Sequence, residues 1–428
     1  MNILLIGGGG REHTLAWKLK QSTHCKQLYI APGNAGTARL GINIALTSTD
    51  FNGLASFCTG NKIDMIIVGP EEPLVKGIYD FFKTNPATAH IHFIGPSKEA
   101  SQLEGSKAYA KAFMNRHNIP TAAYREFDAA NFEEGINYIK NHSLPIVLKA
   151  DGLAAGKGVI ICSSQIEALA EFDLMIQHAK FGEAGKRVVI EQFLDGIELS
   201  VFVLTDGKNY VLLPEAKDYK RIGKGNTGPN TGGMGAVSPV PFADDAYLQK
   251  VKELIVEPTI AGLLSEKLEY QGIVFIGLIN VKGEPFVIEY NCRFGDPETE
   301  VIIPRIENDL VEILLATAQN RLNEIEIKTS SKTAVTVVAV SGGYPNDHET
   351  GKEIYGLDDS AMEGSIIFHS GTRQENNKVL TNGGRVLAVT SFGDNIAEAA
   401  EQSNNLLEQV FFEGVYFRDD IGFEFRQA

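Results

Sequence analysis

The stretch Phe286-Val-Ile-Glu-Tyr-Asn-Cys-Arg-Phe-Gly-Asp-Pro-Glu298 decides how the rest of the chain is interpreted. It follows an apolar run at residues 273–281 and a glycine-containing turn at residues 282–285. Two β-rich runs around such a turn predict a β-hairpin, in which successive side chains alternate between two faces. One face should carry Glu289, Asn291 and Arg293, and the other Ile288, Tyr290 and Cys292.

The polar face of this hairpin offers a carboxylate, a carboxamide oxygen and a guanidinium in a row. Mg²⁺ prefers oxygen ligands and commonly sits between one or two protein oxygens and substrate phosphates. Arg293 could grip a carboxylate or a phosphate with two hydrogen bonds. An ordinary exposed hairpin would show the same pattern, so the strand alone leaves both interpretations open.

Length and charge restrict the class of protein. The chain has 428 residues and a net charge of −15, which predicts two to four domains. No block of Lys and Arg is present, which argues against binding nucleic acid or an anionic membrane through a basic patch. No apolar run is long enough to span a bilayer, and the N-terminus lacks a signal-peptide pattern.

The four cysteines are far apart in the sequence and form no metal-ligand pair. We therefore expect reduced thiols in a cytoplasmic protein, and we expect a monomer. The cysteines are Cys25, Cys58, Cys162 and Cys292.

The first hundred residues alternate between strand and helix patterns. Short apolar runs at residues 3–6, 28–31, 65–68 and 91–94 predict buried strands, and helical patterns include residues 12–21 and 74–83. This alternation predicts a parallel sheet with right-handed crossovers. Glycines follow three strand ends, at residues 7–10, 69 and 95, where ligands of such sheets bind.

The glycine run Gly7-Gly-Gly-Gly10 invites comparison with a dinucleotide-binding loop. The fingerprint fails, because its third glycine position is Glu12 and the second strand does not end in an acid. Small residues at a helix start still let backbone N–H groups approach an anion, and Arg11 adds charge. We favour a sugar-phosphate site over a merely tight turn.

Residues 144–162 predict two strands around the glycine-rich loop Ala150-Asp-Gly-Leu-Ala-Ala-Gly-Lys-Gly158. The loop is not a P-loop, because no Ser or Thr follows Lys157 and no helix follows the loop. Since Lys149 and Lys157 flank it, we favour a flap that covers phosphates over an ordinary hairpin. The preceding helical pattern at residues 106–118 has Ser106 as its N-cap, and we interpret Lys107 and Lys111 as a solvated face.

The middle of the chain contains a second candidate region. A strand at residues 187–191 leads through an acid-bearing turn into a strand at residues 197–204, an arrangement that suits an adenine and a ribose. The polar and glycine-rich segment at residues 214–235 predicts a functional loop rather than a linker, because Lys220, Arg221 and a Thr-Gly-Gly anion nest border it. Helices are predicted at residues 244–267 and 309–320.

From about residue 330 the pattern changes to a small α+β module. Strands are predicted at residues 333–340, 365–369 and 385–390, and a helix at residues 395–408. Few catalytic residue types cluster there, so we expect the module to serve mainly in packing.

Seven stretches together resemble the ATP-grasp superfamily and, within it, the phosphoribosylamine–glycine ligase family. The resemblance covers essentially the whole chain in order. It is carried by Gly7-Gly-Gly-Gly-Arg-Glu-His13, Ala31-Pro-Gly-Asn-Ala-Gly36, Val68-Gly-Pro-Glu71, Leu103-Glu-Gly-Ser-Lys107, Lys149-Ala-Asp-Gly-Leu-Ala-Ala-Gly-Lys157, Thr227-Gly-Pro-Asn-Thr-Gly-Gly-Met-Gly235 and Glu289-Tyr-Asn-Cys-Arg-Phe-Gly-Asp-Pro-Glu298.

The resemblance implies a multidomain α/β and α+β fold. Its parts would be an N-terminal parallel α/β domain at residues 1–103 for the sugar-phosphate substrate, and a two-lobed ATP-grasp core at residues 104–325. A lid subdomain would lie at about residues 121–191 of that core. A small C-terminal α+β domain would occupy residues 326–428.

The resemblance also implies an ATP-dependent, ADP-forming ligase that joins glycine to 5-phosphoribosylamine in purine biosynthesis, through a glycyl phosphate intermediate. The implied ligands are these small molecules, ATP, and Mg²⁺ or Mn²⁺ bound through Glu289 and Asn291. Phosphoryl transfer depends mainly on positioning and charge neutralisation, which a metal, lysines and an arginine can supply.

The remaining site residues are also implied by the resemblance. Catalytic roles fall on Arg293, Asp218 and Lys220. ATP binding falls on Lys107, Lys149, Lys157, Glu191, Leu194 and Glu198. Substrate binding falls on Gly9, Gly10, Arg11, Asn34, Gly36, Glu71, Arg293, Gly295 and Asp296. One departure is visible, because Lys217 and Tyr219 stand where the family usually has Gln and His.

Three other classes of protein remain as alternatives. Another ATP-grasp carboxylate–amine ligase would keep the hairpin and the flap but not the N-terminal glycine run with Arg11. The broken fingerprint speaks against a nicotinamide-dependent oxidoreductase. A non-catalytic nucleotide-binding protein would be expected to lose Glu289, Asn291 or Arg293, and all three are present.

Overall fold

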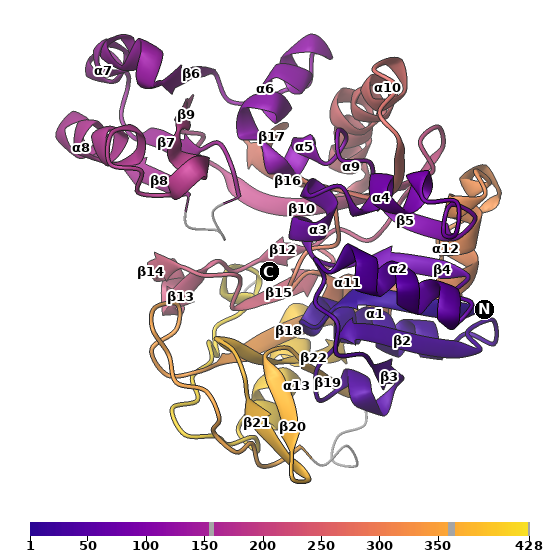
Figure 1. Cartoon of the computed structure of the whole chain (residues 1–428). Helices are drawn as coiled ribbons and strands as arrows, with labels where there is room; N and C mark the ends of the chain where they lie inside the picture. Colours follow the sequence, from indigo (N-terminus) through magenta and orange to yellow (C-terminus); the bar gives the residue numbers. More distant parts are fainter. Residues whose placement is uncertain (154–157, 358–363, 427–428) are drawn as a thin grey trace.

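One continuous sheet joins the N-terminal strands to the 270–291 hairpin. The structure is a computed structural model that describes residues 1–153, 158–357 and 364–426. Within these residues the sheet has nine strands, in the order β11-β10-β16-β5-β4-β1-β2-β3, with β17 paired to β16. The sheet runs through the middle of the molecule, and the lid and the C-terminal module extend from the same side of it (Figure 1).

The N-terminal part contains the parallel sheet that the alternating pattern predicted. Strands β1, β2, β4 and β5 pair in parallel, and their apolar residues are almost fully buried. The strands are β1 Asn2–Gly7, β2 Gln27–Pro32, β3 Ile42–Asn43, β4 Met65–Val68 and β5 His92–Pro96. The helices are α1 Gly10–Lys20, α2 Phe51–Gly60, α3 Glu71–Val75, α4 Ile78–Thr84 and α5 Gln102–Gly105.

The helix predicted at residues 74–83 is wrong in one respect, because two helices occupy that region. Gly77 separates α3 from α4 with φ of +90°. Glycine adopts this left-handed conformation without a steric penalty, so it can end one helix and start the next. The apolar periodicity of the sequence continues across Gly77, so it does not indicate that the helix ends there.

The predicted hairpin is present as β16 Tyr270–Val281 and β17 Glu284–Asn291, which pair antiparallel. The register shifts between Gly277 and Leu278, so that Gly277 faces Glu289 while Leu278 faces Val287. Ile288 is therefore the extra residue of a β-bulge, and the prediction that it shares a face with Tyr290 and Cys292 is wrong. Val287 takes that place in the core instead.

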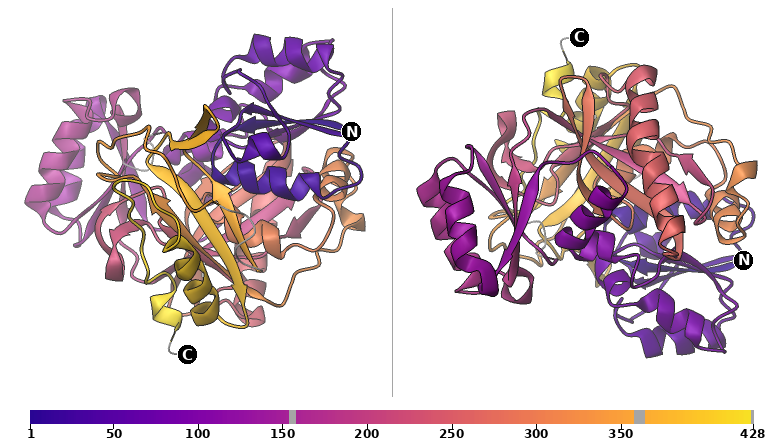
Figure 2. Two further views of the ribbon diagram at one scale, coloured as in Figure 1. Left: turned by 90° about the horizontal axis from the view of Figure 1, so that it is seen from below. Right: turned by 90° about the horizontal axis from the view of Figure 1, so that it is seen from above.

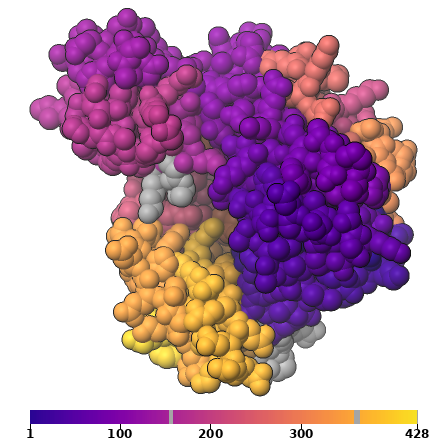
Figure 3. Space-filling model, viewed as in Figure 1, coloured from indigo at the N-terminus to yellow at the C-terminus, as the bar shows by residue number. Residues whose placement is uncertain are grey.

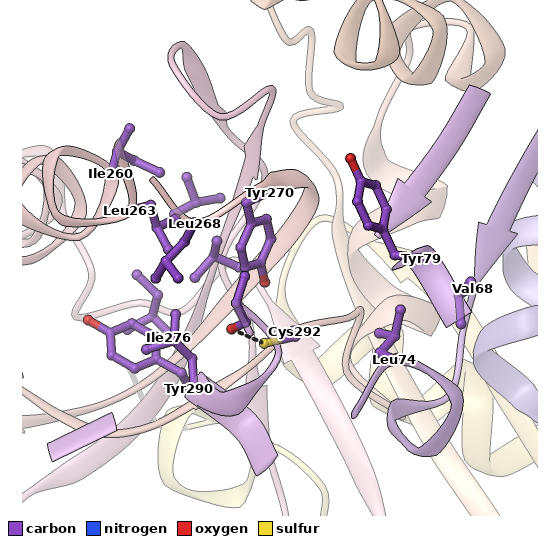
Figure 4. Packing of buried hydrophobic residues seen from close by; sticks show 14 of the residues in the cluster. Val68, Leu74, Tyr79, Ile260, Leu263, Leu268, Tyr270, Ile276, Tyr290 and Cys292 are labelled. Atoms are coloured by element: carbon purple, nitrogen blue, oxygen red, sulfur yellow. Dashed lines mark hydrogen bonds between the residues drawn. The ribbon is translucent and has the colours of Figure 1, made fainter. Parts of the chain in front are cut away.

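The hairpin packs against helices on its apolar face. Strands β10 Ile197–Thr205 and β11 Tyr210–Leu212 extend the sheet on the other side of β16. Helices α9 Asp245–Val251 and α10 Glu257–Ser265 form one rod that contains a π-helical turn, η5 Lys252–Val256. Figure 4 shows Ile260 and Leu263 of this rod packed near Tyr270, Ile276 and Tyr290 of the hairpin.

The lid is a separate small layer with its own core. Its sheet has the order β6-β9-β7-β8, and two helices cover it. The elements are β6 Tyr124–Asp128, α7 Phe132–Lys140, β7 Ile146–Ala150, β8 Val159–Cys162, α8 Gln165–Ile176 and β9 Arg187–Gln192. Figure 1 shows this layer projecting at upper left, and both views of Figure 2 show it standing apart from the N-terminal domain.

The helix between the N-terminal domain and the lid is α6 Lys107–Arg116, which Ser106 caps as predicted. The interpretation of Lys107 and Lys111 as a solvated face is wrong. Lys111 is only 2 % exposed, and its Nζ lies 3.1 Å from Glu191 Oε2. Lys107 is half-buried and donates a hydrogen bond to the carbonyl oxygen of Gly152.

The C-terminal module has the predicted α+β composition, built on a sheet with the order β12-β15-β18-β22-β19. Strand β12 comes from the polar 214–235 segment and β15 begins at the last residue of that segment, so the segment is not a loop throughout. The strands are β12 Lys217–Asp218, β15 Gly235–Ser238, β18 Thr333–Val340, β19 Ser365–His369 and β22 Arg385–Gly393, and helix α13 Ile396–Leu407 packs on β18 and β22.

Smaller elements complete the described chain. They are two hairpins, β13 Arg221–Gly223 with β14 Thr227–Asn230 and β20 Thr372–Glu375 with β21 Lys378–Thr381, helices α11 Thr299–Arg305 and α12 Leu310–Ala318, and 3₁₀ turns η1 Thr37–Arg39, η2 Ala129–Asn131, η3 Gly182–Gly185, η4 Lys224–Asn226, η6 Leu322–Glu324 and η7 Phe423–Phe425. No helix among the described residues is long and apolar enough to cross a membrane.

Candidate active site

Arg293 lies just beyond the end of β17, where side chains from three parts of the chain meet. Its Nη2 lies 2.9 Å from Glu104 Oε1 and donates a 3.2 Å hydrogen bond to Asn291 Oδ1. Its Nε is 3.5 Å from Glu71 Oε2 but is buried and has no hydrogen-bond acceptor within the described residues. One buried donor of this guanidinium is therefore left for a bound anion.

Glu104 fixes the end of the hairpin. Its second carboxylate oxygen accepts a 2.7 Å hydrogen bond from the backbone N–H of Cys292. Burial raises the pKa of Glu104, and the Arg293 guanidinium opposes that rise. Glu71 is more accessible, and although burial acts to raise its pKa, Arg293 and Arg11 together hold that pKa below its ordinary value.

Glu289 and Asn291 project from β17 as a pair of oxygen donors. Both are half-buried. Burial lowers the pKa of Lys107, and the nearby Glu289 carboxylate opposes that change. An acidic and an amide oxygen two residues apart on one strand form a donor set that fits a hard divalent cation.

Lys149 and Lys111 converge on Glu191 at the base of the lid. Glu191 Oε2 lies 3.0 Å from Lys149 Nζ and 3.1 Å from Lys111 Nζ. Burial lowers the pKa of Lys111 to about 8, although Glu191 acts in the opposite direction. The other oxygen, Glu191 Oε1, is buried and has no partner among the described residues, so it can accept a hydrogen bond from a ligand.

The bulge in β17 links this cluster to the hairpin. Lys149 Nζ donates a 3.1 Å hydrogen bond to the carbonyl oxygen of Ile288, the bulged residue. Leu194 lies in the connection between β9 and β10, and Glu198 lies on β10. Lys157 lies outside the described residues.

A second charged cluster lies on β10 and β12. Lys220 Nζ is 2.7 Å from Glu198 Oε2 and 3.9 Å from Asp218 Oδ1. Burial raises the pKa of Asp218 against the influence of Lys220, whereas Lys220 lowers the pKa of Glu198 against its burial. Glu298, which accepts a hydrogen bond from Ser200 Oγ, has a pKa raised to about 7 by burial and by the Asp218 charge.

The glycine-rich turn is enclosed by acids. The N–H of Gly9 donates to Glu12 Oε2 at 2.6 Å, and the N–H of Arg11 donates to Asp296 Oδ2 at 3.3 Å. Arg11 is buried, and its side chain donates to Glu12 Oε1 and to the carbonyl oxygen of Phe294. Burial would lower the pKa of Arg11, but Glu12, Asp296 and Glu71 together raise it.

Asn34 and Gly36 shape this turn from the neighbouring strand end. Asn34 Nδ2 donates to the carbonyl oxygens of Gly8 and His369, and its Oδ1 accepts from the N–H of Gly36 and of Thr37. A Cβ at Gly36 would lie 2.2 Å from the ring of His13, so only glycine fits there. In this structure the side-chain amide of Asn34 therefore stabilises the turn rather than pointing to a substrate site.

The C-terminal module reaches the same region, and the sequence analysis missed this. Arg385 Nη2 lies 3.1 Å from Asp296 Oδ1, and its Nη1 donates to the carbonyl oxygens of Gly232 and Asp296. The expectation that the module serves mainly in packing is therefore incomplete. No local pattern marks Arg385, because its role depends on a residue 89 positions earlier in the chain.

Glu300 is a further residue that the sequence analysis missed. Neither carboxyl oxygen has a hydrogen-bond partner among the described residues, although both are buried. Burial and the nearby Asp296 raise its pKa well above the ordinary value, which favours the neutral form of the side chain. A Cβ at Gly10 would lie 2.3 Å from Glu300 Oε1, which places this carboxyl directly beneath the start of α1.

A cavity of about 300 Å³ lies beside the turn, between α1 and β19. His13 and His369 line it, and the N–H of His369 donates to His13 Nδ1 at 2.7 Å. Burial lowers the pKa of His13 to about 3 and that of His369 to about 4, so both imidazoles are neutral.

The lid and the C-terminal module both contact the region around the hairpin. The space-filling view in Figure 3 shows the surface hollowed between the lid at upper left and the C-terminal module at lower left. Lid residues approach the hairpin through the hydrogen bond from Lys149 to Ile288, and the C-terminal module approaches it through Arg385 and Asp296. The arrangement brings several cationic side chains close to the oxygen donors Glu289 and Asn291.

Three domains of one protein family match successive parts of the chain. The N domain of phosphoribosylglycinamide synthetase matches residues 1–104, its ATP-grasp (A) domain matches residues 105–299, and its C domain matches residues 334–424.

Relatives of known name cover almost the whole chain. A phosphoribosylamine–glycine ligase of Yersinia pestis is 46 % identical over 427 residues, which are 99 % of this chain and 98 % of the relative. The enzyme of the same name from Escherichia coli strain K12 is 45 % identical over 426 residues, with the same coverage.

Solved structures agree with these relatives. The crystal structure of a Thermotoga maritima phosphoribosylamine–glycine ligase is 35 % identical, has a TM-score of 0.85, and covers 98 % of this chain and 100 % of its own. The biotin carboxylase domain of a Hydrogenobacter thermophilus 2-oxoglutarate carboxylase, solved with MgADP, is 15 % identical with a TM-score of 0.73. It covers 98 % of this chain and 92 % of its own, and it shows the shared ATP-grasp fold alone.

Proposed function

The chain belongs to the phosphoribosylamine–glycine ligase family, and we propose that it joins its two substrates through glycyl phosphate. It is an ATP-dependent ligase with the ATP-grasp fold, of the kind used in purine biosynthesis. The reaction converts phosphoribosylamine, glycine and ATP to glycinamide ribonucleotide, ADP and phosphate. The observation that supports the proposed route is the row of Glu289, Asn291 and Arg293, with Lys107 and Lys220 close enough to interact with the Glu289 carboxylate.

Activation of glycine is required because a free carboxylate is a poor electrophile. In the first step a carboxylate oxygen of glycine attacks the γ-phosphorus of ATP, and the bond to the β-phosphate oxygen breaks to release ADP. In the second step the amine of phosphoribosylamine attacks the glycyl carbon and loses a proton. Phosphate then leaves with one oxygen that came from glycine, so the atoms balance.

The two charged ends of glycine have candidate partners on different elements. Arg293 would offer the carboxylate end its Nε, which has no hydrogen-bond acceptor among the described residues. We propose that Asp218, which lies beside Lys220 in the cluster with Glu198, binds the ammonium end. Gly295 also belongs to this substrate region, and a Cβ there would lie 2.4 Å from Glu298 Oε2, so a larger residue would displace that carboxyl.

ATP is proposed to bind between the lid and the hairpin. Its adenine would find an acceptor in the buried Glu191 Oε1 on β9, with Leu194 on the β9–β10 connection and Glu198 on β10 as further contacts. Lys107 and Lys149, together with Lys157, would balance the phosphate charges.

A divalent cation is part of the chemistry of this family, and we propose Mg²⁺ or Mn²⁺ on Glu289 and Asn291. When bound, it would neutralise charge on the transferred phosphoryl group. The oxygen donors suit either ion. Arg293 orients one of these donors, because its Nη2 donates to Asn291 Oδ1.

Phosphoribosylamine is proposed to bind at the glycine-rich turn. Gly9, Gly10 and Arg11 would meet its phosphate, while Glu71 and Asp296 would accept hydrogen bonds from its hydroxyl and amine groups. Asn34 and Gly36 hold the shape of this pocket through the contacts described above. Arg385 adds a second guanidinium at Asp296.

The proposed binding sites for the substrates and ATP fall on different parts of the chain, which suggests three domains. We propose a sugar-phosphate domain at residues 1–103, an ATP-grasp domain at residues 104–325 with its lid at about residues 121–191, and a C-terminal domain at residues 326–428. We further propose a cytoplasmic monomer. The four cysteines are all buried free thiols, which fits a reducing compartment.

The test is release of ADP with each substrate singly and together. Full turnover is expected only with glycine, phosphoribosylamine and ATP combined, and the product should be glycinamide ribonucleotide. ADP release at a comparable rate with another acid or another amine would instead favour a different carboxylate–amine ligase. No ADP release with the full set would refute the proposal.

A further inference from the structure

The last turn of the described chain holds the strand that carries Asp218 and Lys220. Glu424 lies in η7, and its Oε1 is 3.0 Å from Lys217 Nζ. Its other oxygen, Oε2, accepts a 2.9 Å hydrogen bond from the hydroxyl of Tyr219. One carboxylate therefore binds both residues that alternate with Asp218 along the chain.

This alternation divides the strand between two environments. Lys217 and Tyr219 are 7 % and 1 % exposed and face the C-terminal module, whose core includes Tyr219. Asp218 and Lys220 lie by Glu198, on the side of the candidate active site. The backbone is pinned to the neighbouring strand, because the N–H of Tyr219 donates to the carbonyl oxygen of Gly235 at 2.9 Å.

Two cations flank the ring of Tyr219, and they differ in their partners. Lys217 Nζ lies 4.1 Å and Arg418 Cζ lies 5.4 Å from the ring centroid. Arg418 is fully buried but has its own counter-charge, since Nε and Nη2 donate to the two oxygens of Asp420 at 2.8 and 2.9 Å. Within the described residues, the only carboxylate in ion-pair contact with Lys217 is Glu424.

The charge on Lys217 matters for the site because of its position. Its Nζ lies 3.5 Å from the carbonyl oxygen of Asp218, and its charge acts on both Asp218 and Glu198. A buried charge without a counter-ion interacts strongly with its neighbours, because little solvent screens it. Without Glu424, the unbalanced charge of Lys217 would weaken the attraction of the Asp218 carboxylate for a bound ammonium group.

We propose that Glu424 is a positioning residue that neutralises Lys217 and thereby keeps the Asp218 carboxylate available to the ammonium group of glycine. The proposal rests on the role of Asp218 proposed above. Glu424 acts through Lys217 and Tyr219 and touches no substrate.

The test compares three variants by steady-state kinetics at saturating ATP and phosphoribosylamine. Glu424→Gln should raise KM for glycine by about tenfold, because it leaves one positive charge unbalanced beside Asp218. KM for ATP and kcat should change by less than about twofold. Lys217→Gln should leave KM for glycine equal to or below that of the parent enzyme, since it removes the positive charge that weakens the attraction of Asp218 for the ammonium group.

The double variant Lys217→Gln with Glu424→Gln provides the rescue. It removes both charges and should restore KM for glycine to within about twofold of the parent value. Glu413→Gln is the matched control, because it breaks an ion pair with Lys352 in the same module, on the exposed surface. Its kinetics should equal those of the parent enzyme.

Each outcome decides the proposal. An unchanged KM for glycine in Glu424→Gln overturns it. So does a loss of kcat in all three variants without rescue, because that pattern means that Glu424 only holds the C-terminal turn in place. If Glu424→Gln fails to fold, the single Lys217→Gln and the double variant still test the sign of the charge effect. If the parent enzyme itself does not consume glycine, the proposed function fails and not this inference.

Discussion

Replacement of Arg11 by alanine tests whether the glycine-rich turn is organised by its buried ion pair. Arg11 Nε lies 2.6 Å from Glu12 Oε1, and the two side chains are 9 % and 2 % exposed. The same guanidinium donates a 3.0 Å hydrogen bond to the carbonyl oxygen of Phe294, which joins α1 to the segment after the hairpin. Arg11→Ala removes both contacts and leaves Glu12 buried with the N–H of Gly9 as a partner.

The expected size of the effect follows from this burial. Breaking a buried ion pair from one side costs about 3–5 kcal/mol, because the remaining charge is left uncompensated. The variant should therefore unfold at a clearly lower urea concentration. Loss of a charged hydrogen bond to the substrate should raise KM for phosphoribosylamine by roughly ten- to hundredfold, with a much smaller change in KM for ATP.

Equilibrium unfolding in urea and steady-state kinetics on the same preparations separate the two effects. The double variant Arg11→Ala with Glu12→Gln should regain most of the stability, because no buried charge remains unpaired, but it should keep the high KM for phosphoribosylamine. Equal changes in the two KM values would place the phosphate elsewhere. An Arg11→Ala protein as stable as the parent would contradict the description of the ion pair.

Three further predictions concern the metal pair, the lid and a buried acid. Glu289→Ala should abolish turnover at ordinary Mg²⁺ while the circular dichroism spectrum stays unchanged, and retained activity would remove Glu289 from the proposed metal site. Phe172→Ala should destabilise the lid by about 3–5 kcal/mol, measured by hydrogen exchange of β7 and β9, because its fully buried ring stacks on Phe132 at 5.1 Å. Glu298 has a folded pKa raised from 4.5 to about 7, so its stabilising contribution is complete below pH 4.5 and is lost as pH rises through 7. Between pH 5 and 8, the free energy of unfolding in urea should fall by on the order of 2 kcal/mol less in Glu298→Gln than in the parent protein. An identical pH profile in the two proteins would refute the assignment of the raised pKa to Glu298.

The parts of the fold that depend on local patterns could be predicted from the sequence. The N-terminal strands are short apolar runs, and the structure buries them almost completely in parallel pairs. The Ser106 cap and the strand at residues 333–340 also follow from neighbouring residues, and both were predicted correctly. Local patterns work here because the residues that decide each element lie within it.

Features that depend on distant partners escaped the sequence analysis. Lys111 fits a solvated helix face until Glu191, 80 positions later, is brought against it. The bulge at Ile288 follows from the register between β16 and β17, and alternation along one strand does not reveal it. The polar segment at residues 214–235 joins the C-terminal sheet through β12, because β12 pairs with β15 and β15 pairs with the distant β18.

The candidate site shows the same division. The row of Glu289, Asn291 and Arg293 could be predicted because the three residues share one strand and its end. Arg385 and Glu300 could not be predicted, because each interacts with Asp296 only after the chain has folded. Arg11 was recognised as a charge beside the glycines, but its pairing with Glu12 makes it part of the framework as well.

The transfer of oxygen from glycine to phosphate is the most direct test of the proposed acyl-phosphate route. Glycine labelled with heavy oxygen in its carboxylate should pass one labelled oxygen to the released phosphate in each turnover, as mass spectrometry of the phosphate would record. The nucleotide product should be ADP, and the protein should carry no acyl group. Unlabelled phosphate, or AMP as the nucleotide product, would contradict the route through glycyl phosphate.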